Sequence, residues 1–556
     1  MSESGRAAAP PASHRGASEA NGRAATPRAG ATRLAAAKTP RDAPSVFRSI
    51  LFDQPEPTAG VDDAATPAFF ADLQLDRVVG SITKGREEYD LVPLYRAPLH
   101  SVATINYRHE VFRDLENKTV LDDIRSFATK LRWMRRHRAL VGKLHFARQQ
   151  QRWYLRAVED YCDAVKCLAG DLSKARLRSH GMLAFRVYLL SYATSPAFTT
   201  LVEQTTKVAN DLVGLQYNLH IKGNRITVTS YNDQADQGAE VDETFARFKQ
   251  GAVKDYRVAS PAGPADMNHV EAQVLDLVAR IHPEPFRALQ EYCANTSAYT
   301  DPTILTFDRE IQFYVAYREY LERLERPALR FCYPRVSDGS KAIRARDAFD
   351  IALADKLSGD DETVVCNDFQ LDDRERVFVV SGPNNGGKTT FARTFGQLHY
   401  LAALGCQVPG NEAQLFLFDQ MFAHFEREED LATLRGKLED ELYRIHEILE
   451  VATPNSIIIM NESFGSTTLQ DARLLGAKVL ERITQLDLLC VYVTFVDELA
   501  SLNEKIVSMT SMVDPGDPTM RTFKLERRPA DGRAYAAALA QKYRLDYDTL
   551  KAGVAR

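Results

Sequence analysis

A glycine-rich stretch between an apolar run and a Lys-Thr-Thr tripeptide carries the residues best suited to chemistry in this chain. The stretch is VFVVSGPNNGGKTTF, Val377 to Phe391, and Gly382, Gly387, Lys388 and Thr389 have the spacing G-x-x-x-x-G-K-[ST]. Glycines let the backbone curl so that its N–H groups point at phosphate oxygens. The lysine can then contact the β- and γ-phosphates, and the threonine hydroxyl can bind Mg²⁺. The pattern predicts a nucleotide site.

The whole loop and the start of the following helix are expected to bind ATP together with Mg²⁺. The N-terminus of a helix carries a partial positive charge that favours phosphate groups. The residues predicted to contact the nucleotide are Gly382, Pro383, Asn384, Asn385, Gly386, Gly387, Lys388, Thr389 and Thr390. A chance glycine-rich turn is the alternative, and it does not account for the strand-like run before the loop and the helical run after it.

A second apolar run supplies the acidic group that ATP hydrolysis requires. It is SIIIMNE, Ser456 to Glu462, and it predicts a strand that ends beside the phosphates. Glu462 would orient the attacking water there as the catalytic residue, although an exposed carboxylate without function is the alternative. Asn461 stands where an aspartate is expected to hold the water shell of Mg²⁺, and its amide offers an oxygen without charge. We therefore predict an ATPase with slow turnover, with Thr389 and, through water, Asn461 at the metal.

The composition bounds the class of protein. The 556 residues are 45% hydrophobic, which supplies ample core for several domains. The net charge of −5 does not indicate nucleic-acid binding by the chain as a whole, so any such surface must be local. The seven cysteines are scattered without C-x-x-C pairs, which predicts a reduced, cytoplasmic protein. No apolar run reaches the length of a membrane span, so a membrane role is not expected.

The spacing of apolar residues divides the chain into three parts. Residues 1–44 are rich in Ala, Gly, Pro and Arg and predict a disordered basic tail, which is either a solvated tail or a weak contact to an anionic polymer. Residues 45–345 have mainly helical spacing, interrupted by a hairpin signal from Asn218 to Thr229 around Gly223-Asn224. Residues 346–556 alternate buried-strand runs with helices, which predicts a mainly parallel sheet. The predicted fold class is multidomain, α followed by α/β.

The last part resembles the ATPase domain of the MutS family of DNA mismatch-repair proteins. Ser381 to Gly410 is similar to the family's P-loop and the helix after it, and Asn461 to Ala472 resembles the DE-x-GRGTST-x-DG segment. Val364 to Leu371 is similar to the F-V-x-N-D strand, and Tyr95 to Leu115 resembles a pattern of the helical core domain. The resemblance implies an ABC-type P-loop ATPase domain, a helical core and lever that end in a small hairpin clamp, and a homodimer that binds duplex or branched DNA.

Four departures from the family pattern bear on the expected activity. No domain with the mismatch-reading Phe of an F-x-E motif precedes the core, which weighs against mismatch recognition. Asn461 replaces the Walker-B aspartate, and Phe495 replaces the histidine of T-H-x-x-E-L. Gly436 stands near the place of the family's partner-facing Ser-Thr pair, where its amide could still donate a hydrogen bond. These replacements predict tight nucleotide binding and weak hydrolysis.

Two basic stretches are candidates for contact with DNA. Nine cations with aromatic neighbours fall between Lys130 and Arg156, where a solvated helix with its aromatic residues in the core is the plainer interpretation. They are Lys130, Arg132, Arg135, Arg136, Arg138, Lys143, Arg148, Arg152 and Arg156. Lys222, Asn224 and Arg225 crowd the hairpin turn and could contact a backbone phosphate.

The function predicted from the sequence is that of an ATP-controlled DNA-binding dimer. ATP would switch the grip of the clamp, in DNA repair or recombination. Two alternatives remain open. One is an ATP-binding scaffold that assembles with a protein partner and never contacts DNA, and the other is a clamp on structured RNA or the ribosome.

Overall fold

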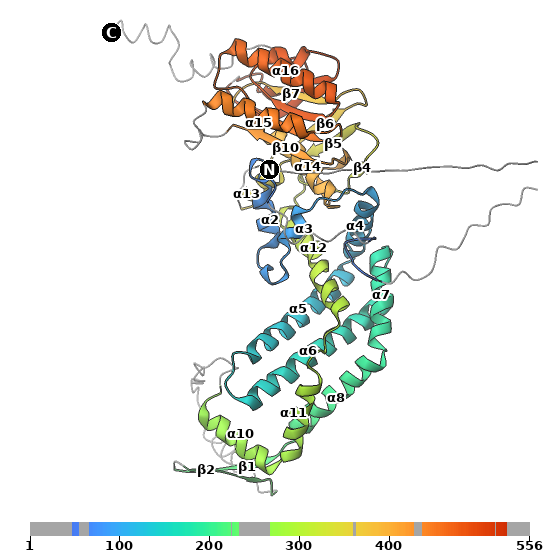
Figure 1. Ribbon diagram of the computed structural model, residues 1–556, viewed down its shortest axis with the longest axis vertical. Coiled ribbons are helices and arrows are strands. Elements are labelled where there is room, and N and C mark those ends of the chain that lie inside the picture. Colours follow the sequence, from blue (N-terminus) through green and yellow to red (C-terminus); the bar gives the residue numbers. More distant parts are fainter. Residues whose placement is uncertain are drawn as a thin grey trace, which may run out of the picture. The chain divides into compact units, whose positions relative to one another are not determined.

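The computed structural model describes residues 47–54, 66–223, 225–232, 267–359, 363–426, 436–517 and 519–530 (Figure 1). A helical region comes first and an α/β region with a mainly parallel six-stranded sheet follows, so the predicted fold class is confirmed. The predicted basic tail and Asn224 of the hairpin turn lie outside the described residues, as does most of the polar stretch after the hairpin. Within the described ranges, no helix is both long enough and apolar enough to cross a membrane.

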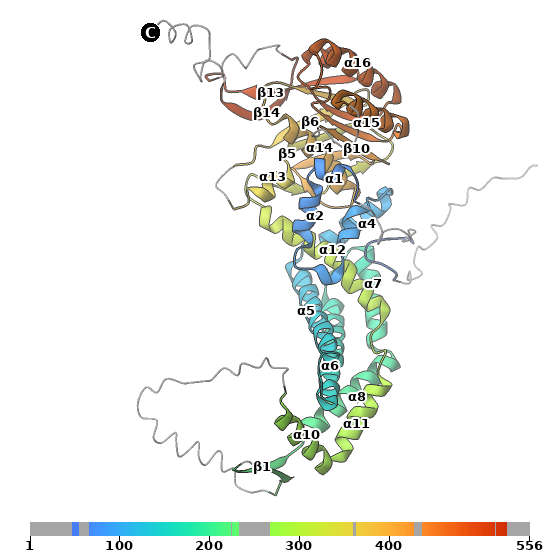
Figure 2. The same ribbon diagram turned by 60° about the vertical axis from the view of Figure 1, so that its left-hand side comes forward.

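The helical region follows the three- and four-residue spacing of its apolar side chains. Its elements are α1 (Phe69–Asp72), α2 (Leu75–Thr83), η1 (Glu87–Tyr89), α3 (Val92–Arg96), α4 (Val102–Leu115), α5 (Lys118–Val141), α6 (Ala147–Lys174), α7 (His180–Ala193), α8 (Pro196–Val213), α10 (His269–Ile281), α11 (Pro283–Asn295) and α12 (Pro302–Leu324). Buried Ile124, Phe127 and Leu131 of α5 recur at this spacing, and α5 and α6 run side by side (Figure 2). Pro283 and Pro302 open α11 and α12, because proline suits the first turn of a helix.

The predicted hairpin is present as β1 (Tyr217–Lys222) and β2 (Arg225–Ser230), paired antiparallel with Lys222 opposite Arg225. Successive side chains point to opposite faces of a strand, so the hairpin has two faces of different character. One face is apolar and carries Tyr217, Leu219, Ile221, Ile226 and Val228. The other is polar and carries Asn218, His220, Lys222, Arg225, Thr227 and Thr229. Strand β2 packs against α10 (Figure 1).

The main sheet has the strand order β10-β11-β12-β7-β13-β14, and its first five strands are parallel. The strands are β7 (Val377–Ser381), β10 (Met421–Phe425), β11 (Ile457–Asn461), β12 (Leu489–Val493), β13 (Ile506–Val513) and β14 (Arg521–Arg527), which pairs antiparallel with β13. The helices between them are α14 (Lys388–Ala403), α15 (Lys437–Val451), α16 (Leu469–Leu486) and η2 (Asp497–Ser501). The carboxyl ends of parallel strands meet at one edge, so the loops after β7, β11 and β12 lie there together.

Strand β7 is buried on both faces, and each face belongs to a different core. Phe378 and Val380 pack in one core with Phe391 and Phe395 of α14. Val377 and Val379 pack in the other core, which contains Leu480 and Ile483 of α16 and Ile445 of α15. Helices α14 and α16 therefore cover opposite faces of the sheet (Figure 2).

A second, four-stranded sheet lies beside this region and was not predicted, apart from its β6 strand. Its order is β4-β9-β5-β6, with β4 (Arg335–Ser337), β9 (Glu412–Phe416), β5 (Ile343–Ala348) and β6 (Asn367–Leu371). Two further elements accompany it, the pair β3 (Phe331–Cys332) with β8 (Val408–Pro409) and the short helix α13 (Ile351–Lys356). The proposed boundary at residue 346 falls inside β5, and the division into domains stays a prediction.

Candidate nucleotide site

The loop between β7 and α14 has the curled backbone that its glycines allow. Gly382 and Gly387 have φ angles of +114° and +91°, in a region that side chains other than glycine rarely adopt. A Cβ on Gly382 would also lie 3.0 Å from the carbonyl oxygen of Ser511 on β13. The Ser511 hydroxyl donates to the carbonyl oxygen of Gly386 at 2.6 Å, which fastens the loop to the sheet.

Lys388 lies inside this loop, and its side chain is 4% exposed. The ammonium donates to the carbonyl oxygens of Gly382 and Pro383 at 3.0 and 3.2 Å and to Asn384 Oδ1 at 3.3 Å. Burial lowers the pKa of Lys388, and the carboxylate of Glu462, 3.9 Å from its Nζ, partly opposes that effect. The site therefore holds a buried cation with one distant carboxylate partner, an arrangement that suits an anionic ligand.

The two predicted metal-binding side chains contact each other. Thr389 Oγ1 donates to Asn461 Oδ1 at 2.9 Å, and Asn461 is the last residue of β11. Mg²⁺ prefers oxygen ligands, so these two neutral oxygen groups fit that ion better than a transition metal. Across the described part of the chain, no cluster of three or more His, Cys, Asp and Glu could hold a metal ion.

Glu462 follows β11 directly and has a φ of +54°. Its backbone N–H donates to the carbonyl oxygen of Val493 on β12 at 2.9 Å, which fixes the turn that carries the side chain. The side chain is 39% exposed and lines the pocket, and its catalytic role stays a prediction. Behind it, Glu441 of α15 accepts a hydrogen bond from the N–H of Phe464 at 3.2 Å, and burial raises the pKa of Glu441.

These groups border a pocket of about 600 Å³. Its phosphate side consists of Asn384, Asn385, Gly386, Gly387, Lys388, Thr389, Thr390 and Glu462. The remaining predicted residues lie just behind: Gly382 and Pro383 accept hydrogen bonds from Lys388, and Asn461 contacts Thr389. Whether these residues bind nucleotide stays a prediction.

The rest of the pocket lining, which we call the second wall, was largely missed by the sequence analysis, and it meets the loop at Phe523, whose carbonyl oxygen would lie 3.6 Å from a Cβ on Gly387. The second wall consists of Leu353, Leu357, Thr363, Val365, Asn367 and Phe523. Asn367 fixes part of it, because its Nδ2 donates to the Phe523 carbonyl oxygen at 3.1 Å and its Oδ1 accepts from the N–H of Leu525 at 2.8 Å. Val365 and Asn367 had a signal in the sequence, as parts of the F-V-x-N-D-like stretch. The other apolar residues of this wall belong to no spaced pattern.

The region that contains the phosphate loop is similar to a known protein family. Residues 378–535 match the family model for MutS domain V. This region is thus similar to MutS domain V. MutS domain V is an ABC-type ATPase domain, so the predicted resemblance is confirmed for the region that contains the phosphate loop.

The similarity to curated MutS proteins is distant and partial. The DNA mismatch repair protein MutS of Caldicellulosiruptor saccharolyticus is 33% identical over 146 residues, which are 26% of this chain and 17% of that protein. The MutS of Pseudothermotoga lettingae is 27% identical over 256 residues, 45% of this chain and 30% of that protein. Endonuclease MutS2 of Gemmatimonas aurantiaca is 30% identical over 189 residues, 33% of this chain and 23% of that protein. The matches thus span less than a third of each relative.

Two positions at which the chain departs from the MutS pattern do not line the pocket. Phe495 follows β12, and its side chain is 46% exposed. Gly436 directly precedes α15 as its N-cap residue, and a Cβ there would contact no atom within 4 Å.

The basic stretch of α5 and α6 is largely neutralised by acidic neighbours. Six of its nine cations form ion pairs, which are Lys130–Asp163, Arg132–Glu88, Arg135–Asp308, Arg148–Asp276, Arg152–Glu159 and Arg156–Asp160. A cation that is already paired gains less from a phosphate, since it must give up its carboxylate. The pairing favours the plainer interpretation of solvated helices for this stretch.

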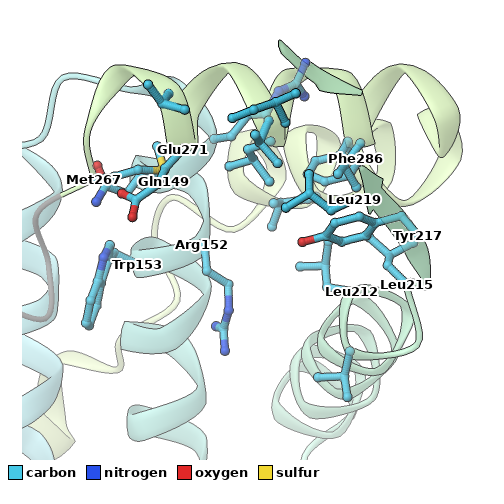
Figure 3. Close-up of a pocket in the computed structure, with 18 residues that line it drawn as sticks. Gln149, Arg152, Trp153, Leu212, Leu215, Tyr217, Leu219, Met267, Glu271 and Phe286 are labelled. Atoms are coloured by element: carbon cyan, nitrogen blue, oxygen red, sulfur yellow. The ribbon is translucent and has the colours of Figure 1, made fainter. Parts of the chain in front are cut away.

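A second pocket, of about 680 Å³, lies between the hairpin and the helices around it (Figure 3). Its lining is mainly apolar and comes from α6, α8, β1, β2, α10 and α11. Leu212, Tyr217, Leu219 and Phe286 line one side, with Trp153 and Arg152 on the other (Figure 3). Charged and amide side chains at this pocket are Arg148, Gln149, Arg152 and Glu271, and Trp153 and Tyr217 each add one polar group.

Proposed function

We propose that this protein is an ATP-controlled DNA-binding protein that acts as a nucleotide-gated dimeric clamp in DNA repair or recombination. The observation that carries the proposal is the pocket in a MutS domain V to which β7, α14 and β11 bring Lys388, Thr389 and Glu462 together. The relatives named DNA mismatch repair protein MutS support the connection to DNA repair.

The loop amides and Lys388 would bind the phosphates, and Thr389 with Asn461 would hold Mg²⁺ through its water shell. When bound, the ion neutralises charge on the phosphate oxygens. Glu462 would orient the attacking water from its place beside Lys388. Asn461 contributes no negative charge to the metal site, so slow turnover is proposed.

Binding of DNA is proposed for the polar face of the hairpin. Its side chains His220, Lys222 and Arg225 are exposed. Cations at a strand turn can contact backbone phosphates without reading the sequence. A grip of this kind needs a second clamp opposite the first, which a homodimer supplies.

The nucleotide part is tested by measuring MgATP and MgADP binding by calorimetry in the wild type and in Lys388→Ala. Hydrogen bonds to a charged group contribute up to about 3 kcal/mol, which predicts an affinity loss of about 100-fold. Lys143→Ala, a change at an exposed lysine of the α5–α6 connection, serves as the control and should bind like the wild type. Absence of any ATP or ADP binding by the wild type would refute the proposal.

The DNA part is tested at low salt with duplex, mismatched, branched and single-stranded DNA, in the presence and absence of MgATP. We expect the paired change Lys222→Glu and Arg225→Glu to weaken binding uniformly, and Lys207→Glu on α8 to leave it unchanged. No binding to any of these DNAs removes the DNA function. Structured ribosomal RNA in the same assay distinguishes the RNA alternative.

The scaffold alternative is favoured by one observation, the mainly apolar second pocket beside the hairpin. Apolar pockets with a few polar groups bind small molecules or apolar side chains rather than a phosphate backbone. The same binding assays test this alternative. A scaffold is expected to bind ATP but none of the DNA or RNA molecules.

A further inference from the structure

Gln397 of α14 is a completely buried amide that connects three segments of the chain. Its Nε2 donates to the carbonyl oxygen of Leu73 at 2.9 Å and to Asp350 Oδ1 at 2.8 Å. Its Oε1 accepts from the N–H of Ile351 at 3.0 Å. Leu73 belongs to the turn between α1 and α2, and Ile351 begins α13. Both amide protons and the amide oxygen are therefore used, and any replacement leaves a buried polar group without its partner.

The contact to α13 bears on the nucleotide pocket. Asp350, 2% exposed, is the N-cap residue of α13, and its Oδ1 also accepts from the N–H groups of Ala352 and Leu353 at 2.9 and 3.1 Å. A helix of six residues depends on such contacts, because an isolated short helix is unstable in water. Leu353 of α13 and Leu357, the residue directly after this helix, belong to the second wall of the pocket.

The same helix α14 also begins in the phosphate loop. Lys388, Thr389 and Thr390 of its first turn line the pocket. Gln397 follows nine residues after Lys388, which places it about 13 Å further along the helix axis at ~1.5 Å per residue. Helix α14 thus meets the phosphate side of the pocket at its start and the second wall through Gln397.

The turn between α1 and α2 is held closely against α14. A Cβ on Gly396 would lie 2.7 Å from Leu73 Cδ1 and 2.5 Å from Ile459 Cδ1 of β11, so only glycine leaves room for both side chains. Arg393 Nε donates to the carbonyl oxygen of Asp72 at 3.0 Å. The amide of Gln397 therefore joins the pocket wall to the helical region at a site where the packing permits little movement.

We propose that Gln397 is a positioning residue that holds the α13 wall against the nucleoside part of a bound nucleotide and ties that wall to the α1–α2 turn. The inference rests on the proposed binding of nucleotide in this pocket. The phosphate groups contact the loop, whereas the nucleoside reaches the wall that Gln397 supports. Loss of the amide should consequently weaken the binding of nucleoside triphosphates and leave the binding of inorganic triphosphate unchanged.

The test compares MgATP with magnesium tripolyphosphate, both measured by calorimetry. In Gln397→Leu, which keeps the volume but removes the amide, we expect the affinity for ATP to fall about tenfold, or about 1.4 kcal/mol, with tripolyphosphate unchanged. Gln312→Leu is the matched control, because Gln312 is also a buried glutamine, 2% exposed, but lies on α12 outside the pocket. It should leave both affinities unchanged.

A second variant keeps the test decisive if Gln397→Leu does not fold. Gln397→Glu retains the acceptor for Ile351 but places a carboxylate beside Asp350, so it should lose at least as much ATP affinity while tripolyphosphate still binds. Unchanged ATP affinity, or equal losses for ATP and tripolyphosphate, would overturn the role of Gln397. A wild type that binds neither ligand overturns the proposed nucleotide function instead.

Discussion

At the scale of single residues, the most consequential departure from the MutS pattern is an amide where a carboxylate is expected. Asn461 Oδ1 accepts a hydrogen bond from Thr389 at the place where Mg²⁺ is proposed to bind. An amide oxygen supplies a lone pair but no negative charge to a divalent cation. This single atom's difference is therefore expected to weaken the metal site without disturbing the loop.

Restoring the charge tests that expectation. In Asn461→Asp we expect the Mg²⁺ concentration needed for half-maximal ATP turnover to fall about tenfold, because Mg²⁺ affinity rises with the number of ligand charges, and turnover to increase. Steady-state phosphate release against Mg²⁺ concentration measures both. Asn503→Asp, at an exposed site whose side-chain oxygen keeps its acceptor role, is the control. An unchanged Mg²⁺ requirement would contradict the role of Asn461.

The sequence indicated the phosphate side of the pocket because the residues of that side are neighbours in the chain. Glycines, lysine and threonine at fixed spacing determine a loop geometry within a few residues of each other. Apart from Val365 and Asn367, the second wall could not be predicted in this way, since Leu353 and Phe523 are apolar residues about 170 positions apart by their numbering and meet only in the folded chain. Gln397 gave no signal either, because its importance comes from three partners remote in sequence.

At the scale of elements, the contact between α5 and α12 contains a buried ion pair. Asp308 of α12, 1% exposed, contacts Arg135 of α5, with Tyr89, Glu88 and Arg132 nearby. Burial raises the pKa of Asp308 to about 6, although Arg135 opposes the effect. A buried carboxylate of this kind makes the packing of two helices depend on pH.

The sign of that dependence follows from the raised pKa. The folded protein holds the Asp308 proton more tightly than the unfolded chain, so the contribution to stability is full below pH 3.8 and is lost as the pH rises through about 6. The shift corresponds to about 3 kcal/mol at most. Asp308→Asn should therefore gain stability relative to the wild type as the pH rises from 4 to 7, measured by urea unfolding. Asp276→Asn, at an exposed ion pair, should show no such gain.

A second prediction at this scale concerns the packing of α14 against its neighbours. Gly396→Ala should lower the free energy of unfolding, because overpacking costs about 1–3 kcal/mol and outweighs the roughly 1 kcal/mol that alanine gains in a helix. Gly170→Ala on α6 is the matched control, because its Cβ would meet nothing within 4 Å, and it should be stabilising. Urea unfolding of both variants measures the change in the free energy of unfolding. A stabilised Gly396→Ala would contradict the prediction and show that Leu73 and Ile459 move to accommodate the Cβ.

Elements with a strong local period were predicted well, and those without one were missed. The long helices α5 and α6 and the buried strands β7, β11 and β12 repeat their apolar residues at helical or strand spacing. The strands of the second sheet are short and mix charged with apolar residues, as in Arg344 and Arg346 of β5, so their sequence resembles a loop. Only pairing with distant strands makes them a sheet.

At the scale of the whole molecule, the proposed dimer would couple the bound nucleotide to the association of two subunits. Two large apolar side chains follow strands at the edge that carries the phosphate loop, Leu469 after β11 and Phe495 after β12, and they are 61% and 46% exposed. Both positions are candidates for the surface of the proposed dimer, because a second subunit that covered them would remove these apolar side chains from water.

We expect MgATP to shift the protein from monomer towards dimer in sedimentation velocity experiments. Leu469→Asp and Phe495→Asp should each reduce the dimer fraction, since a charge would be buried without a partner. Val187→Asp, at a residue of α7 that is 54% exposed, is the control and should dimerise as the wild type does. A dimer fraction that changes neither with nucleotide nor with the two substitutions would contradict this arrangement.

The two cores that share β7 have a consequence for the evolution of this region. Because alternate residues of that strand serve opposite cores, deleting or inserting one residue would exchange Val379 with its neighbours between the cores and rotate the phosphate loop that follows. Related chains should therefore keep an invariant number of residues from Val377 to Lys388. Length variation among them is expected in connections that belong to neither core, such as the turn between β13 and β14.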